Sequence, residues 1–314
     1  MTEKKYAFLF PGQGAQYTGM GLDFAKESYA KQIFELASDI MGQDMEDLLA
    51  NSDAESLKQT KIAQPAITVV NLTAAAALQA RGIMPCACAG HSLGEYAALC
   101  TAGVFGLQDC LMLVKERGAF MQATGEAIKP HGDDGIVMAA VIGLDPAKVE
   151  EVVENAHKTG INNVFTANYN SSKQTVLSGL PADMAKIESF FKDAGARRFM
   201  PLKVAGPFHS PLMAEAENKF AAVLEKVVFN NSTVPVFSNV SGKAVKDATE
   251  TKSLLLRQIT SGVHWIDEEA GIAALGVDAV CEVGPGKVLC GLWEQAGSGV
   301  PSFAAGTLAD VLKI

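Results

Sequence analysis

Residues 84–103 read M-P-C-A-C-A-G-H-S-L-G-E-Y-A-A-L-C-T-A-G, and this stretch decides the fold. Its segment 86–89 is short, apolar and rich in small residues, as a buried parallel strand can be. The pattern G-x-S-x-G follows at 90–94, and a helical run completes the stretch. A strand, a serine between glycines and a helix form the arrangement of a nucleophile elbow. The stretch therefore predicts an α/β fold with Ser92 at a sharp turn.

The position of Ser92 at this turn suits a nucleophile. Its hydroxyl would be exposed beside the free backbone N–H groups at the start of the helix, Leu93 N–H first, and such donors stabilise an oxyanion. Serine is also a favoured helix N-cap, so the pentapeptide alone also fits an ordinary turn between a strand and a helix. The rest of the chain has to distinguish these interpretations.

Composition indicates a globular chain. Of the 314 residues, 48% are apolar and 19% are charged. A chain of this length is enough for one large domain or two unequal ones. The net charge of −9 and the pI near 5.1 argue against nucleic acid as the main partner. A local basic patch on an acidic chain is still compatible with an acidic protein partner.

Neither a membrane segment nor a metal site is expected. The apolar run 6–10 ends at Pro11, too early for a signal peptide, and the run 66–80 contains polar residues and suits a buried helix better than a membrane span. The cysteines lie in or beside apolar segments without zinc spacing, so we expect free thiols in a reducing compartment. They are Cys86, Cys88, Cys100, Cys110, Cys281 and Cys290.

A strand over 5–10 leads into the loop P-G-Q-G-A-Q at 11–16. Tyr17 stands where a dinucleotide-binding fingerprint needs its third glycine, so this motif does not predict a nucleotide site. The loop instead places Gln13 at the carboxyl edge of a sheet, where α/β proteins bind ligands. Gln13 would face Ser92 if both strands end at that edge, although a solvated loop glutamine fits the pattern equally well.

Helical spacing over 107–121 places Arg117 within an apolar stripe, with Leu113, Val114, Phe120 and Met121 one turn away. A buried arginine is rare unless it is paired. Its partner is either a carboxylate of the protein or the anion of a ligand, and the sequence does not decide between them.

A G-D-D-G break at 132–135 precedes a segment with its own pattern. The order strand, helix, strand, strand, helix, strand is that of a ferredoxin-like unit. We therefore expect a large domain from 1–131 and 205–314, with a small domain at 132–204 inserted. The expected elements of the insertion are 137–143, 146–158, 163–168, 174–179, 181–194 and 197–204, with a polar turn at 170–173.

His209 lies in G-P-F-H-S-P at 206–211. Ser210 followed by Pro211 predicts a helix start, so the helix dipole would keep the imidazole of His209 neutral, as a general base requires. A structural histidine held between two prolines also fits. The other histidines are weaker candidates, because His131 and His157 lie in polar segments and His91 and His264 are assigned to the elbow and to a packing turn.

Elsewhere the pattern is α/β. Two polar amphipathic helices are expected within 23–57, and a helix that begins at Gln64-Pro65 with the proline in its first position runs to residue 80. After His209 we expect a helix at 212–227, a strand at 234–240, a helix around 254–260, a strand at 279–283 and a final helix that ends at 296.

These candidates together suit acyl transfer through a serine. Hydrolases of this kind place an acid and then a late histidine after the serine. Here a long α/β stretch follows His209 and no acid stands out, which favours a transferase over a hydrolase.

The sequence resembles the malonyl-CoA:acyl carrier protein transacylases, the acyltransferases of bacterial-type fatty acid synthesis. The resemblance covers essentially the whole chain in order. Its motifs are F-P-G-Q-G-A-Q at 10–16, Q-P-A at 64–66, G-H-S-L-G-E-Y-A-A-L at 90–99, R-G at 117–118, A-N-Y-N-S at 167–171, P-F-H-S-P-L-M at 207–213, S-N-V at 238–240 and E-V-G-P-G-K-V-L at 282–289.

The resemblance implies an α/β-hydrolase-like large domain with a parallel sheet and an inserted ferredoxin-like small domain. It makes Ser92 the nucleophile and His209 its base, with the backbone carbonyl of Gln258 orienting the histidine. The backbone N–H groups of Gln13 and Leu93 would form the oxyanion hole.

For substrate binding, the resemblance implies that Arg117 takes the malonyl carboxylate and that Gln64 and Asn168 line the cleft. Phe208 matches the aromatic of malonyl-selective members, which discourages a methylmalonyl group. Two departures are the segment 128–135, which differs from a shorter glycine-rich linker, and Gly206, where alanine is frequent.

The implied substrates are malonyl-CoA and acyl carrier protein, with no cofactor, no nucleic acid and no membrane partner, in a cytoplasmic and monomeric enzyme. An acyltransferase for another acyl group, a thioester hydrolase and a non-catalytic carrier-docking homologue are the alternatives. An acidic carrier protein would suit a local basic patch, although an ordinary solvated face is also compatible with its candidates, which are Lys192, Arg197, Arg198 and Lys203.

Overall fold

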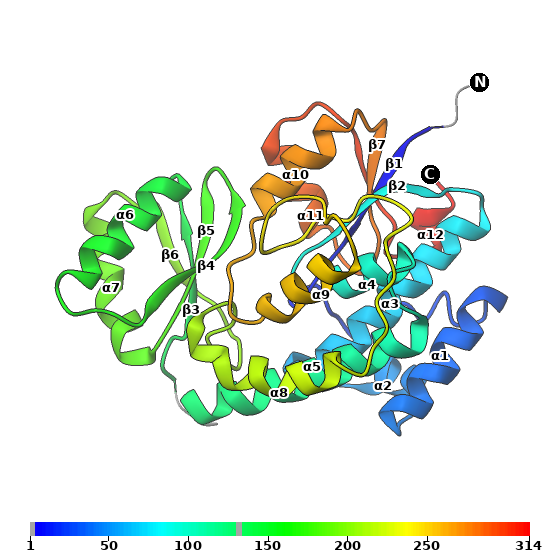
Figure 1. Ribbon diagram of the computed structural model, residues 1–314, viewed down its shortest axis with the longest axis horizontal. Helices are drawn as coiled ribbons and strands as arrows, with labels where there is room; N and C mark the ends of the chain where they lie inside the picture. The colour runs from blue at the N-terminus through cyan, green and yellow to red at the C-terminus, as the bar shows by residue number, and fades with distance from the viewer. Residues whose placement is uncertain (1–3, 130–133) are drawn as a thin grey trace.

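The structure is a computed structural model and describes residues 4–129 and 134–314. Figure 1 shows one group of elements, drawn in green, around an antiparallel sheet, and a larger group around a parallel sheet. The expected domain boundary at 131/132 and His131 lie outside the described residues. The elements near the N-terminus and C-terminus that are not discussed further are α1 (Ser28–Met41), α2 (Met45–Asn51), the short helix η1 (Ser56–Lys58) and α12 (Leu308–Val311).

The parallel sheet has the strand order β2-β1-β7-β8, and all its pairings are parallel. Alternate side chains of β1 enter two different cores, because Phe8 and Phe10 join one apolar cluster and Ala7 and Leu9 join another around Trp265. A strand covered on both faces needs apolar residues throughout, which is why this segment has no polar alternation. The strands are β1 (Tyr6–Phe10), β2 (Pro85–Gly90), β7 (Ala279–Glu282) and β8 (Ser302–Ala304).

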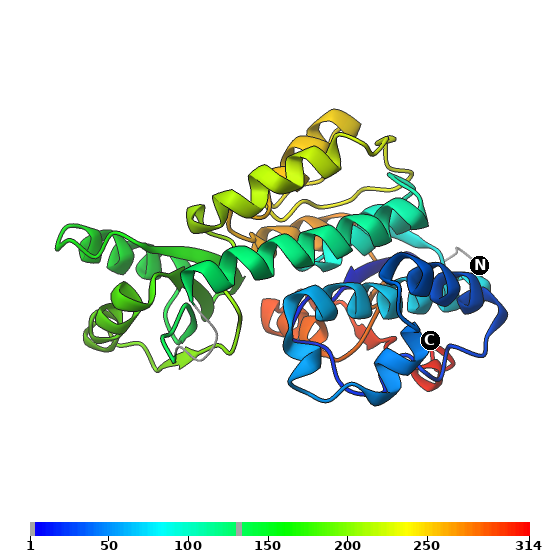
Figure 2. The ribbon, with the colours of Figure 1, turned by 90° about the horizontal axis from the view of Figure 1, so that it is seen from below.

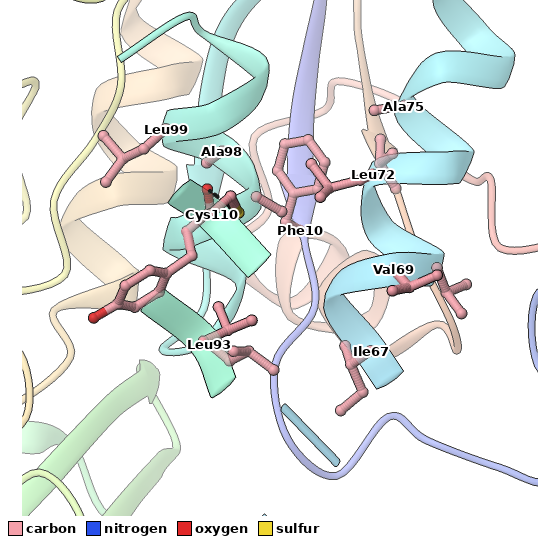
Figure 3. Close-up of a cluster of buried hydrophobic side chains, with 14 of the residues drawn as sticks. Phe10, Ile67, Val69, Leu72, Ala75, Leu93, Ala98, Leu99 and Cys110 are labelled. Atoms are coloured by element: carbon pink, nitrogen blue, oxygen red, sulfur yellow. Dashed lines mark hydrogen bonds between the residues drawn. The ribbon is translucent and has the colours of Figure 1, made fainter. Parts of the chain in front are cut away.

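Helices cover the face of the sheet to which Phe10 points. In Figure 3, Phe10 lies between α3, which contributes Leu72, and α4, which contributes Ala98. A hydrogen bond from the Cys110 thiol of α5 to the Tyr96 carbonyl oxygen, 3.5 Å long, ties α5 to α4. These helices are α3 (Thr60–Ala80), α4 (Gly94–Thr101) and α5 (Leu107–Ile128).

The start of α3 differs from the sequence expectation. The helix begins at Thr60, and Pro65 lies inside it instead of in its first position. The proline removes one intrahelical hydrogen bond, and this loss is tolerated because neighbouring helices bury most of α3. With 21 residues, α3 is long and apolar enough to cross a membrane by length and composition alone. Because 83% of its apolar window is buried inside the protein, α3 is a core helix.

The second sheet is antiparallel throughout, with the order β4-β5-β3-β6. The predicted order of strands and helices is observed. Two elements differ from their expected bounds by more than one residue, because β4 extends to Ser171, which shortens the expected turn, and β6 covers only Arg198–Pro201. The elements are β3 (Met138–Ile142), α6 (Pro146–His157), β4 (Val164–Ser171), β5 (Gln174–Gly179), α7 (Pro181–Asp193) and β6 (Arg198–Pro201).

Two predictions in the last third of the chain are wrong, and a predicted helix is confirmed with shorter bounds. The segment 234–240 is not a strand, because it pairs with β2 only through an isolated bridge between Cys88 and Val236, and Pro235 lacks an N–H to donate. The expected helix at 212–227 is a short 3-10 turn followed by a shorter α8. His264 precedes a helix, α10, instead of a packing turn. The elements are η2 (Pro211–Met213), α8 (Ala214–Leu224), α9 (Ala248–Arg257), α10 (Trp265–Ala274) and α11 (Val288–Ala296).

Helix α5 joins the two groups of elements. Figure 2 shows it as the long helix that runs from the larger group to the green one. The chain returns from the antiparallel sheet across α5 at Gly206, where an added Cβ would lie 2.6 Å from the Cα atom of Gly125. The glycine at 206, a departure noted in the sequence, therefore permits a close backbone crossing.

Candidate active site

Ser92 lies at the turn between β2 and α4, as the sequence predicts. Its φ of 51° is in the left-handed region, which is strained for a residue with a side chain. The two glycines of the motif make the turn sterically feasible, because a Cβ on Gly90 would lie 2.0 Å from the carbonyl carbon of Gly94, and one on Gly94 would lie 1.9 Å from the Phe10 carbonyl oxygen. The Ser92 backbone N–H donates to Asn239 Oδ1 at 2.7 Å, which supports the strained turn from behind.

His209 contacts Ser92 directly. The distance between Ser92 Oγ and His209 Nε2 is 2.7 Å. On the other side of the ring, Nδ1 lies 2.9 Å from the carbonyl oxygen of Gln258 and 3.2 Å from that of Ser261. Because carbonyl oxygens only accept, Nδ1 carries the proton, and Nε2 is left to accept from the Ser92 hydroxyl. This is the geometry of a serine with a general base.

Burial is the main cause that keeps the imidazole of His209 neutral. Ser210 precedes a helical segment but does not cap it through its side chain, because its hydroxyl donates to the Pro207 carbonyl oxygen at 2.6 Å, and a three-residue 3-10 helix leads directly into α8. Burial and, second to it, the nearby positive charge of Arg117 lower the pKa of His209 to about 3. The sequence-based argument named only the helix dipole and missed burial and Arg117, the two largest causes of the lowered pKa in the folded protein.

We expect the reaction of Ser92 with a serine-directed phosphonate to keep its rate when the pH falls from about 7 to about 5. His209 stays neutral down to about pH 3, so the base form is not lost in this window. The same lowered pKa has an opposite effect on stability, which falls as the pH drops below about 6.5, since only the unfolded state takes up this proton.

The measurement is the labelling rate across this pH range, with unfolding followed separately. Burial raises the pKa of the neighbouring Glu95 to about 7, so the Glu95→Gln variant is a control that removes a second titrating group near the site. A tenfold loss of rate centred near pH 6.5, roughly the ordinary histidine pKa, would contradict the expectation.

Arg117 is fully buried beside these two residues. Its Nη2 donates to Ser92 Oγ at 3.2 Å and to Gln258 Oε1 at 2.9 Å, and its Cζ lies 5.3 Å from the centre of the Tyr96 ring. Within the described residues, no Asp or Glu oxygen lies within 4.0 Å of its nitrogens, and its Nε has no hydrogen-bond partner. The sequence left two kinds of partner for this arginine, a carboxylate of the protein or the anion of a ligand. No carboxylate pairs with it in the described part of the chain, so the anion of a ligand remains.

A cavity of about 300 Å³ lies in front of the serine, between the loop after β1 and the antiparallel sheet. Ser92, His209 and Arg117 reach it, and so do Gln13, Gln64 and Asn168. Gln64 is buried, and its Oε1 has no partner among the described residues. The apolar part of the wall includes Met121, Met138, Val176, Leu202, Val204 and Phe208.

The two residues expected to provide oxyanion donors differ in their position relative to the cavity. Gln13 lines the cavity, whereas Leu93 is buried and is not among the lining residues. Among residues 4–129 and 134–314, neither backbone N–H donates a hydrogen bond, so both are free to bind an oxyanion.

Several polar residues behind the cavity were given no role by sequence reasoning. Asn239 and Glu95 lie behind Ser92, and His91 Nε2 is 2.8 Å from Asn170 Oδ1 at the edge of the cavity. They occur in the motifs that carry the resemblance, but a motif does not say which side chains meet. In the described part of the chain, no group of three or more His, Cys, Asp or Glu is arranged to hold a metal ion.

Comparisons with known proteins show the family of this chain. The acyl transferase domain family matches residues 7–309. The malonyl CoA-acyl carrier protein transacylase of Escherichia coli K12 is 41% identical over 298 residues, which cover 93% of this chain and 92% of the relative. An acyl carrier protein S-malonyltransferase from Vibrio cholerae has a crystal structure with a TM-score of 0.91 and 35% identity, with 98% and 99% of the two chains covered.

A further solved structure is a malonyl-transacylase in complex with a type II PKS acyl-carrier protein. Its TM-score is 0.91 at 33% identity, with 98% of each chain covered. The family match spans nearly the whole chain and includes every residue of the cavity. This chain belongs to the acyl transferase family and is an acyltransferase.

Proposed function

We propose that this enzyme transfers the malonyl group of malonyl-CoA to the phosphopantetheine thiol of acyl carrier protein through a malonyl ester of Ser92. The observation that carries the proposal is the position of Arg117. Its guanidinium has no carboxylate partner in the described residues and lies 3.2 Å from the Ser92 hydroxyl. A malonyl group has a carboxylate two bonds from its thioester carbon. When that carbon is held at Ser92, the carboxylate can therefore pair with the guanidinium of Arg117. The names of the relatives agree with this substrate.

In the first half-reaction, Ser92 Oγ attacks the thioester carbon while His209 Nε2 takes the hydroxyl proton. The oxyanion would bind the backbone N–H groups of Gln13 and Leu93. When the carbon–sulfur bond breaks, His209 returns the proton to the CoA sulfur, and malonyl stays on Ser92. The carbonyls at Nδ1 stabilise the imidazolium in place of a carboxylate.

In the second half-reaction, the carrier thiol gives its proton to His209 and attacks the ester carbon. The bond to Ser92 Oγ breaks, and the serine recovers the proton from His209. The apolar walls of the narrow cavity disfavour water as a competing nucleophile. Gln64 and Asn168 are proposed to line the path of the acyl group, and neither takes a proton.

Intact-mass analysis after brief incubation with malonyl-CoA alone tests this proposal. We expect a malonyl adduct that maps to Ser92 and disappears when carrier protein with its phosphopantetheine is added. A thioester hydrolase would consume malonyl-CoA without carrier protein, and a docking homologue would form no adduct. An enzyme for another acyl group would form its adduct with that thioester instead.

Phe208 is proposed to select malonyl over methylmalonyl. It lines the cavity directly before His209, and its ring lies beside Gly206. We expect Phe208→Ala to raise kcat/KM for methylmalonyl-CoA relative to malonyl-CoA on the order of tenfold, the range for one methyl group in an apolar pocket. The measurement is acylation with each thioester, with Phe208→Leu as an intermediate control. An unchanged ratio would remove Phe208 from the determinants of specificity.

We infer a two-domain organisation for this site. The strand order β4-β5-β3-β6 and the β-α-β-β-α-β chain order support a ferredoxin-like small domain at 132–204. The parallel sheet with an elbow serine supports an α/β-hydrolase-like large domain from 1–131 and 205–314. The cavity then lies between the two domains, a usual place for a ligand site.

The proposed partners are malonyl-CoA and acyl carrier protein, for a monomeric, cytoplasmic enzyme that needs no cofactor, metal, nucleic acid or membrane. The relative solved with its carrier protein supports the second partner. The candidate basic residues for carrier binding are exposed, and Lys203 lies between two residues that line the cavity, Leu202 and Val204. These residues are Lys192, Arg197, Arg198 and Lys203; an ordinary solvated face would give them the same exposure.

A further inference from the structure

The side chain of Gln258 lies beneath the cavity and connects Arg117 to a buried carboxylate. It is fully buried. Its Oε1 accepts from Arg117 Nη2 at 2.9 Å, and its Nε2 donates to Glu95 Oε2 at 2.6 Å and to the Ser92 carbonyl oxygen at 2.8 Å. Asn239 Oδ1 is a further acceptor, at 3.2 Å. The mechanism above uses only the backbone carbonyl of Gln258, so this side chain has no assigned role.

The direction of the Gln258 amide is set by its neighbours. If the amide were flipped, its NH₂ group would face the guanidinium of Arg117, which only donates, and its oxygen would face the Ser92 carbonyl, which only accepts. Glu95 itself is held in place, because its Oε2 also accepts the Asn239 backbone N–H at 3.3 Å. The acceptor at Glu95 Oε2 therefore holds the Gln258 oxygen toward Arg117.

This contact matters most after Ser92 is acylated. The guanidinium sits on a side chain with many rotamers, and ordering it has an entropic cost. Its described hydrogen-bond acceptors are Ser92 Oγ and Gln258 Oε1. Acylation converts Oγ into an ester oxygen, a poorer acceptor, so Gln258 Oε1 is the contact that still directs Arg117 while the acyl group waits for the carrier protein.

We propose that Gln258, through its side chain, is a positioning residue that aims Arg117 at the carboxylate of the acyl group, and that Glu95 sets the direction of its amide. The inference rests on the proposed function, because a carboxylate on the acyl group is what the aimed guanidinium binds. It requires an acceptor at Glu95 Oε2 and does not require a charge there.

The first experiment compares Gln258→Met and Glu95→Met with the conservative variant Glu95→Gln. All three keep the Gln258 backbone carbonyl that contacts His209. The readout is kcat/KM for acylation of the full-length enzyme with malonyl-CoA and with acetyl-CoA, which has no carboxylate. Both Met variants are expected to lower the malonyl value on the order of tenfold, as for a lost hydrogen bond to a charged group, and the acetyl value less than about threefold.

Glu95→Gln is expected to keep the ratio of malonyl to acetyl values within about threefold of the unmodified enzyme, because an amide oxygen can accept from Gln258 as the carboxylate does. A Glu95→Gln ratio as low as that of Glu95→Met would overturn the assigned role of Glu95. Equal losses for both substrates in the Met variants would mean that these residues only support the fold, and would overturn the inference.

The second experiment exchanges the two groups in the double variant Gln258→Glu with Glu95→Gln. The exchange preserves the number of amides and carboxylates but moves the carboxylate next to Arg117, where it competes with the malonyl carboxylate. We expect a larger loss of malonyl preference than in Gln258→Met, with acetyl transfer retained. An unchanged ratio in the exchanged variant overturns the inference, even if the Met variants fail to fold in a melting assay.

The unmodified enzyme separates this inference from the proposed function. If it forms no malonyl adduct on Ser92, the proposed function is wrong. If it forms that adduct and the variants keep its preference for malonyl over acetyl, only the role of Gln258 and Glu95 is wrong.

Discussion

Ser92→Ala is expected to abolish malonyl transfer, with kcat/KM lowered on the order of 10⁴-fold or more. Oγ is the nucleophile in this proposal, and it lies 2.7 Å from the base nitrogen of His209. Alanine keeps a Cβ at a residue with a φ of 51°, so the substitution removes Oγ without giving the turn the freedom of glycine. The measurement is malonyl transfer to carrier protein, together with the intact mass after exposure to malonyl-CoA.

Ser172→Ala is the matched control, because Ser172 is an exposed serine in the turn between β4 and β5. This variant should transfer malonyl at the unmodified rate, and both variants should melt at similar temperatures. A malonyl adduct that persists on Ser92→Ala would locate the nucleophile elsewhere and refute the proposed mechanism.

Arg117→Ala is expected to lower kcat/KM for malonyl-CoA by about 10²–10³-fold, the range for one partner of a buried, hydrogen-bonded charge pair. Acetyl-CoA has no carboxylate, so its acylation of Ser92 should change much less. The guanidinium has no Asp or Glu partner within 4.0 Å in the described residues, so its removal leaves no protein carboxylate unpaired there. The measurement is the ratio of the two kcat/KM values.

Two further variants sharpen this test. Arg117→Lys keeps the charge but not the planar fork, so it should recover only part of the malonyl activity. Arg198→Ala removes an exposed arginine and should leave acylation with either thioester unchanged. Equal losses of malonyl and acetyl acylation in Arg117→Ala would show that the arginine supports the site without recognising the carboxylate.

Local patterns predicted the elements that are determined by neighbours in sequence. The elbow at Ser92 could be recognised because its close contacts involve glycines within the same short motif, at Gly90 and Gly94. The β-α-β-β-α-β order could be recognised because its strands and helices have distinct periodicities and clear turns. Segment bounds were less certain, since α3 begins before Pro65 and the expected strand at 234–240 makes only isolated bridges.

The burial of Arg117 was also readable from sequence, because its apolar neighbours repeat with the period of a helix. Its partner was not readable. Whether a carboxylate or a ligand anion pairs with the guanidinium depends on which groups other elements bring within reach, and the closest described contacts are Ser92 and Gln258. Likewise, His209 was predicted to be a neutral base from a helix dipole alone, whereas burial and the charge of Arg117, which depend on the tertiary structure, are the largest causes of its lowered pKa.

The sequence by itself determined the α/β class, the elbow serine and the helical stripe that buries Arg117, because these follow from steric and periodic relations among residues close in the chain. Only the tertiary structure decided that His209 meets Ser92, 117 positions away, and that Gln258 joins Arg117 to Glu95 across 141 and 163 positions. Hydrogen bonds and desolvation act over a few ångströms in space, and a sequence pattern does not contain the distances between segments that only the folded core brings together.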